Sequence, residues 1–166
     1  WYYTINVCNF AISRCGEDNS QLSNKMKRIK GQVLFLRGLS YYNLVGYYQN
    51  PPLITDYATY SSLDGLYTTN STYDNVLDQK DFHEAMELLP SRDEGGEWAG
   101  GRATCGAAAG YYARALMMRQ KYSDALTVLK DIIGKKYGTY RLMSNYGDNF
   151  REGSAYENNA ESLFEV

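Results

Sequence analysis

Hydrophobic residues recur at intervals of three and four along much of this chain, which is the spacing of one face of an α-helix. The first such run predicts a helix over residues 2–15. Gly16 is expected to end it, because glycine commonly occupies the position after the last helical turn. The face that repeats in this helix consists of Ile5, Cys8, Ile12 and Cys15.

The longest run predicts a second helix from about Gln21 to Tyr48, roughly 40 Å long at the α-helical rise. Asn50 is expected to lie beyond its end, because a residue that precedes proline is disfavoured in the helical conformation. Its inward stripe is predicted to consist of Leu22, Met26, Ile29, Val33, Leu36, Ser40, Leu44 and Tyr47. Three glycines in this helix are interpreted as points of close packing: Gly31, Gly38 and Gly46.

Residues 51–70 have no helical period and are rich in Thr, Ser, Tyr, Asp and Asn. They predict a long loop, the kind of segment in which binding residues are often found. Ser71 and Asp74 resemble a capping pair at the start of the next helix, which Pro90 is expected to end. A glycine-rich loop over residues 91–101 follows.

The clearest pair of helices is predicted between residues 104 and 133, with a short turn at Gln120 and Lys121. Thr104 can cap the first helix, and Gly134 is expected to end the second. The pair has the spacing of a tetratricopeptide-like hairpin, although the chain shows no strict repeat period. The inward residues are predicted to be Ala107, Ala108, Tyr111, Ala115 and Met118 in the first helix, and Ala125, Leu126, Leu129, Ile132 and Ile133 in the second.

These patterns predict an all-α fold of tetratricopeptide-like helical hairpins, an α–α superhelix with long loops. The length of 166 residues is enough for one core, so residues 1–166 are predicted to form a single helical-repeat domain. The chain begins at Trp1 and ends on an apolar element with nothing after it to pack on, so we interpret it as a piece of a longer protein. Coil with short turns is expected after Gly138.

Composition excludes several classes of function. The net charge of −2 argues against nucleic acid as the main partner, because phosphate binding needs clustered Lys and Arg, and the basic run over residues 25–30 is predicted to be a solvated helix face. The three cysteines form neither a CxxC motif nor a Cys/His cluster. Free buried thiols are therefore expected, without a zinc site or another cofactor. No stretch approaches the roughly 18 apolar residues of a membrane span.

Residue patterns of an enzyme are missing from the sequence. His83 is the single histidine, and no G-x-S-x-G or other nucleophile motif accompanies it. The carboxylate pairs Glu84–Glu87 and Asp93–Glu94 are expected on exposed surfaces. The glycines of residues 95–101 lack the G-x-x-x-x-G-K-[ST] pattern of a phosphate loop. We therefore predict a protein without catalytic activity.

Several segments together carry a family resemblance. They are Phe35-Leu36-Arg37 followed by tyrosines; Pro52-Leu53-Ile54; Asp81-Phe82 to Pro90; Gly101-Arg102-Ala103-Thr104 with Gly106-Ala107-Ala108 and Ala113-Arg114; and Glu161-Ser162-Leu163-Phe164-Glu165-Val166. In this order they resemble the SusD/RagB family, the surface lipoproteins that bind nutrients at the outer membrane of Bacteroidetes bacteria. The chain departs from the family pattern at Cys105, where lysine is usual, at Asn50-Pro51, where Gly-Asp is usual, and at Lys80, where an apolar residue is common.

This resemblance implies a chain that covers a SusC-like TonB-dependent outer-membrane barrel and holds a glycan or peptide ligand for import. It implies a place at the cell outer membrane, exposed at the surface through a lipid anchor that is not part of these residues. The implied mechanism is capture without chemistry, in which aromatic rings stack on sugar rings and polar side chains bond to sugar hydroxyls.

Five aromatic residues are the candidate ligand-binding residues, because they lie at the chain start or in predicted loops rather than on helical stripes. They are Trp1, Tyr57, Tyr60, Tyr67 and Trp98. Local packing is the alternative role for each, since aromatic side chains serve both purposes. The alternative function is a tetratricopeptide-like adaptor that binds a protein segment in its groove, and a glycan hydrolase would need a carboxylate pair that faces one cleft.

Overall fold

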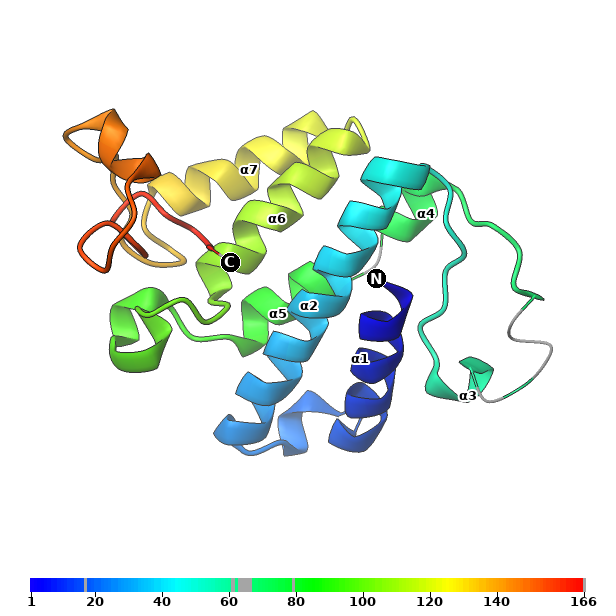
Figure 1. Cartoon of the computed structure of the whole chain (residues 1–166). Coiled ribbons are helices and arrows are strands. Elements are labelled where there is room, and N and C mark those ends of the chain that lie inside the picture. Colours follow the sequence, from blue (N-terminus) through cyan, green and yellow to red (C-terminus); the bar gives the residue numbers. More distant parts are fainter. Residues whose placement is uncertain (17, 61, 63–66, 79, 166) are drawn as a thin grey trace.

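The computed structural model describes residues 1–16, 18–60, 62, 67–78 and 80–165, which form a helical molecule (Figure 1). The longer helices are α1 (Tyr2–Cys15), α2 (Asn24–Tyr48), α5 (Asp81–Leu88), α6 (Cys105–Met118) and α7 (Tyr122–Ile133). Two short helices lie between α2 and α5, namely α3 (Tyr57–Tyr60) and α4 (Tyr73–Leu77). Turns of 3₁₀ helix lie at Asn19–Gln21, Arg92–Glu94, Gly96–Trp98 and Tyr146–Phe150.

The longer helices pack side by side in chain order, as the sequence predicts for helical hairpins. α1 lies along α2, α5 packs against α2, α6 packs on α5, and α7 packs on α6 (Figure 1). The described residues contain an isolated bridge between Pro52 and Asn70 but no β-strand. The prediction of an all-α fold of tetratricopeptide-like hairpins with long loops is therefore confirmed.

The segment predicted as one helix over residues 71–89 forms two helices, α4 and α5, so that prediction was wrong. The start was also misplaced by one residue, because Oγ1 of Thr72 rather than Ser71 caps α4, accepting from the Asn75 N–H at 3.3 Å. Long-range ion pairs lie at the end of α4. Arg119, just after α6, binds the carboxylates of both Asp74 and Asp78, which holds the last turn of α4 against α6.

Helix α2 begins at Asn24 and buries only part of the predicted stripe. Ser40 and Leu44 of that stripe are buried as predicted, whereas Ile29, Leu36 and Tyr47 are 39%, 43% and 74% exposed. The other buried apolar residues of this helix lie outside the stripe, and they are Leu34, Phe35, Tyr41 and Val45. The physical reason is that α2 lies between α1 and α5 and is therefore covered on two sides, which a single stripe cannot describe.

Two of the three glycines in α2 are close-packing points, as predicted. A Cβ atom at Gly31 would lie 2.9 Å from the Leu89 side chain, and one at Gly38 would lie 3.0 Å from the Phe82 ring. These contacts bring α5 against the backbone of α2. At Gly46 a Cβ would meet nothing within 4 Å, so the same interpretation was wrong there.

Phe35 is the centre of the aromatic core. Its ring is fully buried and lies 5.9, 5.7 and 4.8 Å, between ring centroids, from Phe82, Tyr111 and Phe164. Edge-to-face geometry at these distances favours each pair beyond simple burial. The contact with Phe164 shows that the last described segment returns to the core, and Arg92 holds it there by donating to three backbone carbonyls, those of Asn158, Asn159 and Ser162, at 3.0 Å each.

Helix α7 buries Ala125 and Val128, while Leu126, Leu129 and Ile133 are 52%, 38% and 82% exposed. The inward face predicted for this helix was therefore wrong for these three residues. The main partner of α7 is α6, where Ala125 and Val128 cluster with Ala109, Ala113 and Leu116, and Ile132 packs against this cluster. Outward Leu and Ile residues remain as an apolar stripe on the surface of the described chain.

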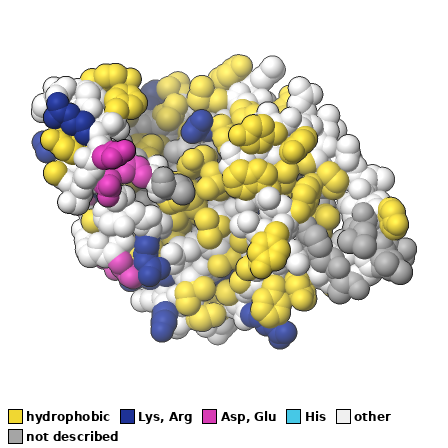
Figure 2. All heavy atoms as spheres, viewed as in Figure 1, with side chains coloured by type: hydrophobic (Ala, Val, Ile, Leu, Met, Phe, Trp, Pro, Cys, Tyr) yellow, Lys and Arg dark blue, Asp and Glu magenta, His cyan; other side chains and the backbone are white. Residues whose placement is uncertain are grey.

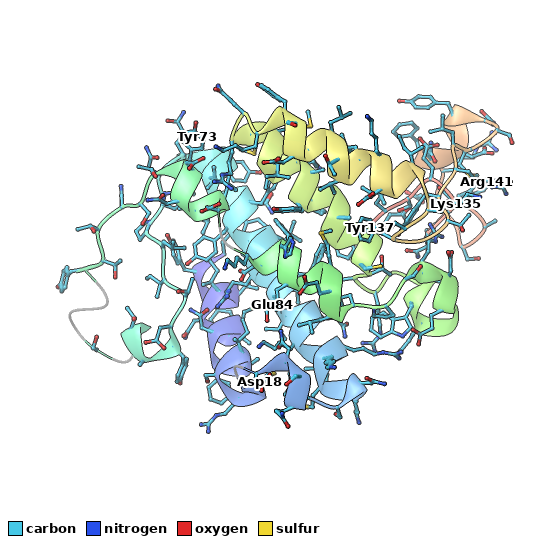
Figure 3. All side chains as sticks on the ribbon, turned by 180° about the vertical axis from the view of Figure 1, so that it is seen from behind. Asp18, Tyr73, Glu84, Lys135, Tyr137 and Arg141 are labelled. Atoms are coloured by element: carbon cyan, nitrogen blue, oxygen red, sulfur yellow. The ribbon has the colours of Figure 1, made fainter. Side chains whose placement is uncertain are left out.

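The basic run over residues 25–30 contains one buried member, which corrects the prediction of a solvated face. Lys30 is 4% exposed, and its Nζ donates to the Gly16 carbonyl at 3.0 Å and to Oδ1 of Asn19 at 2.9 Å. It also lies 3.3 Å from a carboxylate oxygen of Glu84. Figure 3 labels Glu84 on α5. Lys30 therefore ties the end of α1 to α5.

No helix among the described residues has the length and apolar content needed to cross a bilayer.

Candidate functional site

A surface hollow of about 570 Å³ lies where the start of α1, the end of α2 and the following loop meet. We call it the Trp1–Tyr48 hollow. Its lining residues are Trp1, Tyr2, Leu44, Tyr48, Asn50, Pro51, Pro52 and Asn70. The volume falls within the roughly 300–1,000 Å³ of small-molecule sites, and the lining combines aromatic rings with amide groups. Hydrophobic side chains also spread across the face that α1, α2 and α6 present (Figure 2).

Two aromatic side chains in this lining are open to solvent. Trp1 is 53% exposed and Tyr48 is 70% exposed, whereas Leu44 beneath them is 4% exposed. The sequence produces this arrangement locally, because α2 ends at Tyr48 and Gln49 turns the chain away with a φ of 60°. The Pro51–Pro52 pair cannot continue a helix, so the chain leaves α2 as an extended wall of the hollow.

Hydrogen bonds hold this wall in place. The Tyr2 hydroxyl donates to the Pro52 carbonyl at 2.8 Å, and the Ser71 N–H donates to the Pro51 carbonyl at 3.2 Å. Oδ1 of Asn50 accepts from the N–H of Tyr73 at the start of α4, at 2.8 Å. Since the oxygen of Asn50 is engaged, its Nδ2 group is the side-chain donor that this residue offers to a ligand.

A buried polar network anchors the loop just beyond the hollow. Arg37 donates to both carboxylate oxygens of Asp81, at 2.8 and 2.6 Å, and also to Oδ1 of Asn9 and the carbonyl of Thr55, at 2.8 and 3.1 Å. Nδ2 of Asn9 donates to the Ile54 carbonyl at 2.9 Å. Burial raises the pKa of the Asp81 carboxyl, while the Arg37 hydrogen bonds and charge act in the opposite direction. This network connects α1, α2 and α5 to the loop.

The structure brings one of the five predicted ligand-binding residues, Trp1, into the hollow. Tyr57 packs edge-on against Phe10 of α1, with ring centroids 5.0 Å apart, and is 38% exposed. Tyr67 lies in the long loop and is 84% exposed. Tyr60 ends α3, and its side chain lies outside the described part of the structure.

Trp98 differs from Trp1, Tyr57 and Tyr67 because it is only 6% exposed. The guanidinium groups of Arg28 and Arg102 lie 5.5 and 5.7 Å from its ring centroid. Packing and cation–π contacts therefore occupy much of this side chain. Its role as a ligand-binding residue, like those of the other four, stays a prediction.

Sequence reasoning missed the remaining residues of the hollow. Tyr48 is the last residue of α2, and the residue before it, Tyr47, belongs to the predicted inward stripe. The order of residues along the chain does not indicate that Tyr48 lies close to Asn70 or Trp1. The usable signal was the position of Tyr48 directly before Gln49-Asn50-Pro51-Pro52, where the helix must end and its last side chains become exposed.

A second hollow of about 510 Å³ lies near α4, α5 and α6 and contains one of the two candidate carboxylate pairs, Glu84–Glu87. Its lining residues are Asn19, Asp78, Lys80, His83, Glu84, Glu87, Tyr112 and Arg119. Glu84 is bound by Lys30 and Asn19, and Asp78 is bound by Arg119. These acids serve ion pairs that join helices. The described residues contain no group of three or more His, Cys, Asp or Glu side chains placed to hold a metal ion.

A comparison with known protein families identifies the family of this chain. A family model of SusD-like proteins, described as starch-binding and associating with the outer membrane, matches residues 1–117. The chain belongs to this SusD-like family. The motifs that suggested it now have structural roles, since Arg37 and Asp81 form the buried ion pair and Thr104 caps α6 with an N–H···Oγ1 bond of 3.2 Å.

Solved structures of SusD-like proteins share the fold. A SusD-like protein from Bacteroides fragilis is 25% identical with a TM-score of 0.82, over 99% of this chain and 32% of its own. A laminarin-binding SusD-like protein is 26% identical with a TM-score of 0.80, over 99% of this chain and 36% of its own.

A surface glycan-binding protein from Bacteroides thetaiotaomicron, in complex with laminarihexaose, is 24% identical with a TM-score of 0.74. It is covered over 33% of its length, against 98% of this chain. At 24% identity, this likeness shows a shared fold. The chain spans about one third of the length of the structural relatives that it matches. The comparison with curated proteins found no match.

Proposed function

We propose that this chain binds saccharide in the Trp1–Tyr48 hollow, as part of a nutrient-binding protein at the outer-membrane surface. The observation that carries the proposal is the pairing of two solvent-open rings, those of Trp1 and Tyr48, with amide groups from Asn50 and Asn70 around one hollow. The family description of starch binding at the outer membrane and the laminarin-binding relative support it.

The chemistry of the hollow suits a sugar ring. One face of a pyranose presents C–H groups that stack on an aromatic ring, while its hydroxyls require hydrogen-bond partners around the edge. Trp1 and Tyr48 offer the rings, and Nδ2 of Asn50 offers a donor held in place by the bond from Tyr73 to Oδ1. Because the wall is already pinned by Tyr2, little ordering is needed when a ligand binds.

The proposed mechanism is capture without covalent change. The hollow has no acidic side chain in its lining, and glycoside hydrolysis requires two carboxyl groups on either side of the scissile bond. In the second hollow, Glu84 and Asp78 are engaged in ion pairs with Lys30 and Arg119, and Glu87 lies 3.8 Å from Nδ1 of His83. Release of the ligand would therefore be a dissociation step, in which it passes to a SusC-like TonB-dependent barrel.

The proposal places the protein on the cell surface, tethered by a lipid anchor outside these residues and seated on that barrel. The rigid succession of α1, α2, α5, α6 and α7 would provide the frame against which the barrel rests, as helical-repeat surfaces do in general. A peptide in place of a glycan is the other ligand that the family resemblance implies.

Affinity electrophoresis of the full-length protein through gels that contain single polysaccharides tests the binding site. We expect retardation by at least one polysaccharide, and loss of most of it in Tyr48→Ala, because an aromatic stacking partner has been removed. Tyr47→Ala is the matched control, since Tyr47 is 74% exposed on the same helical turn but lies outside the hollow lining. Equal loss in both variants, or none in Tyr48→Ala, contradicts the assignment of the site.

The adaptor function remains a second candidate because α7 presents the exposed apolar residues Leu126, Leu129 and Ile133. A pull-down of the full-length protein from detergent-solubilised outer membranes, followed by mass spectrometry, separates the two. A co-purified TonB-dependent barrel supports the import function. Recovery of soluble proteins without a barrel supports the adaptor.

A further inference from the structure

We infer that the Trp1–Tyr48 hollow selects uncharged saccharides and rejects those that carry carboxylate or sulfate groups. The inference rests on the proposed function and names its ligand class. Its basis is the lining itself, in which none of the eight side chains carries a charge at neutral pH. Sites that take carboxylate or sulfate usually offer Arg or Lys at the point of contact.

Two cations on the helices that line the hollow have contacts elsewhere. Arg37 on α2 is 7% exposed and directs its guanidinium to Asp81, Asn9 and the Thr55 carbonyl. On α1, Arg14 lies over the ring of Phe10, with 5.1 Å between its Cζ and the ring centroid, in the last turn of that helix. α1 contributes to the hollow through its opposite end, at Tyr2.

The element next to Asn50 offers no cation of its own. Tyr73, whose N–H holds Asn50, begins α4, and residues Tyr73–Leu77 of this helix include no Lys or Arg. Its Asp74 is paired with Arg119 and also interacts with the charge of Lys121. An anionic sugar would therefore find no attractive partner on α4.

The aromatic walls act in the same direction. The face of an aromatic ring carries the negative part of its quadrupole, which attracts cations and disfavours anions. A carboxylate that stacks with its sugar on Trp1 or Tyr48 would lose water without gaining a counter-ion. The amide groups of Asn50 and Asn70 can bond to it, but neutral donors compensate a buried charge poorly compared with a cation.

A matched set of polymers tests this selectivity in the full-length protein. A neutral polysaccharide that retards the protein is converted to two derivatives with the same degree of substitution, one hydroxyethylated and one carboxymethylated. Both add bulk at the same hydroxyls, and only the second adds charge. We expect the carboxymethyl derivative to bind at least tenfold more weakly than the hydroxyethyl derivative at 0.15 M salt, about 1.4 kcal/mol.

Asn70→Lys provides the converse test, because it adds a cation at the exposed rim. This variant is expected to raise retention on the carboxymethyl derivative relative to retention on the neutral parent, and Asn70→Gln is the uncharged control for the same position. Equal binding of both derivatives by the natural protein overturns the selectivity and leaves the proposed function standing. Retention on polygalacturonate with none on any neutral polysaccharide also overturns it, whereas retention on no polysaccharide removes the proposed function and the selectivity together.

Discussion

Removal of one member of the Arg37–Asp81 pair should strongly destabilise the fold. Arg37→Met leaves the Asp81 carboxylate, which is 4% exposed, without its two charge-assisted hydrogen bonds of 2.8 and 2.6 Å. Breaking one side of a buried ion pair costs about 3–5 kcal/mol. The bonds from Arg37 to Asn9 and the Thr55 carbonyl are lost as well, at about 1 kcal/mol each.

The double variant Arg37→Met, Asp81→Leu separates this explanation from a simple loss of packing. With both charges gone, no uncompensated group stays buried, and apolar replacements of buried pairs are often neutral. We therefore expect the double variant to recover at least about 2 kcal/mol relative to the sum of the single variants. Asp81→Leu alone should resemble Arg37→Met, since it leaves the guanidinium buried without a counter-ion.

Urea unfolding of the full-length protein, followed by circular dichroism, provides the free energies for this double-mutant cycle. Additive losses in the double variant would refute the reasoning, because they would mean that the two residues act independently. A secondary effect is expected on ligand binding. Arg37 and Asn9 anchor the loop at Thr55 and Ile54, a few residues from the hollow wall, so polysaccharide retention should weaken in Arg37→Met even where the protein stays folded.

Two further predictions concern the core. Gly38→Ala should destabilise the protein by about 1–3 kcal/mol, because its new Cβ would lie 3.0 Å from a phenylalanine ring of α5. Gly46→Ala should stabilise the protein by about 0.5–1 kcal/mol, because a Cβ there meets nothing within 4 Å, and thermal unfolding of the two variants measures the difference. Burial raises the pKa of the Cys8 and Cys105 thiols to about 11, so both should resist iodoacetamide at pH 8 in the folded protein and react in urea, as peptide mass spectrometry can measure. The same pKa shift gives the direction in which stability changes with pH. Because these thiols ionise near pH 9 in the unfolded chain and near pH 11 in the folded protein, the free energy of unfolding should fall as the pH rises from 9 to 11. A flat profile over this range would contradict the assigned burial.

Local sequence determined where most helices begin and end. The end of α2 before Pro51, the Thr104 cap and the α6–α7 hairpin follow from neighbouring residues, because capping, proline geometry and apolar period are local effects. The family motifs also lie in these elements, so all-α architecture and family membership could be recognised without coordinates. Trp1 could be chosen as a candidate because an aromatic residue outside a helical stripe has no packing role assigned by the pattern, and its role in binding stays a prediction.

Tertiary structure decided which faces are buried and which residues share a site. α2 has apolar residues around much of its circumference, so only its position between α1 and α5 selects Phe35 over Leu36 for the core. In α7 the period marked Leu126 as inward, but the contact with α6 buries Val128 instead. The Trp1–Tyr48 hollow joins residues from α1, α2 and the loop up to Asn70, and those contacts depend on the Arg37–Asp81 network and the Tyr2–Pro52 bond. Sequence periodicity describes one helix at a time, whereas burial and binding depend on the helices that surround it.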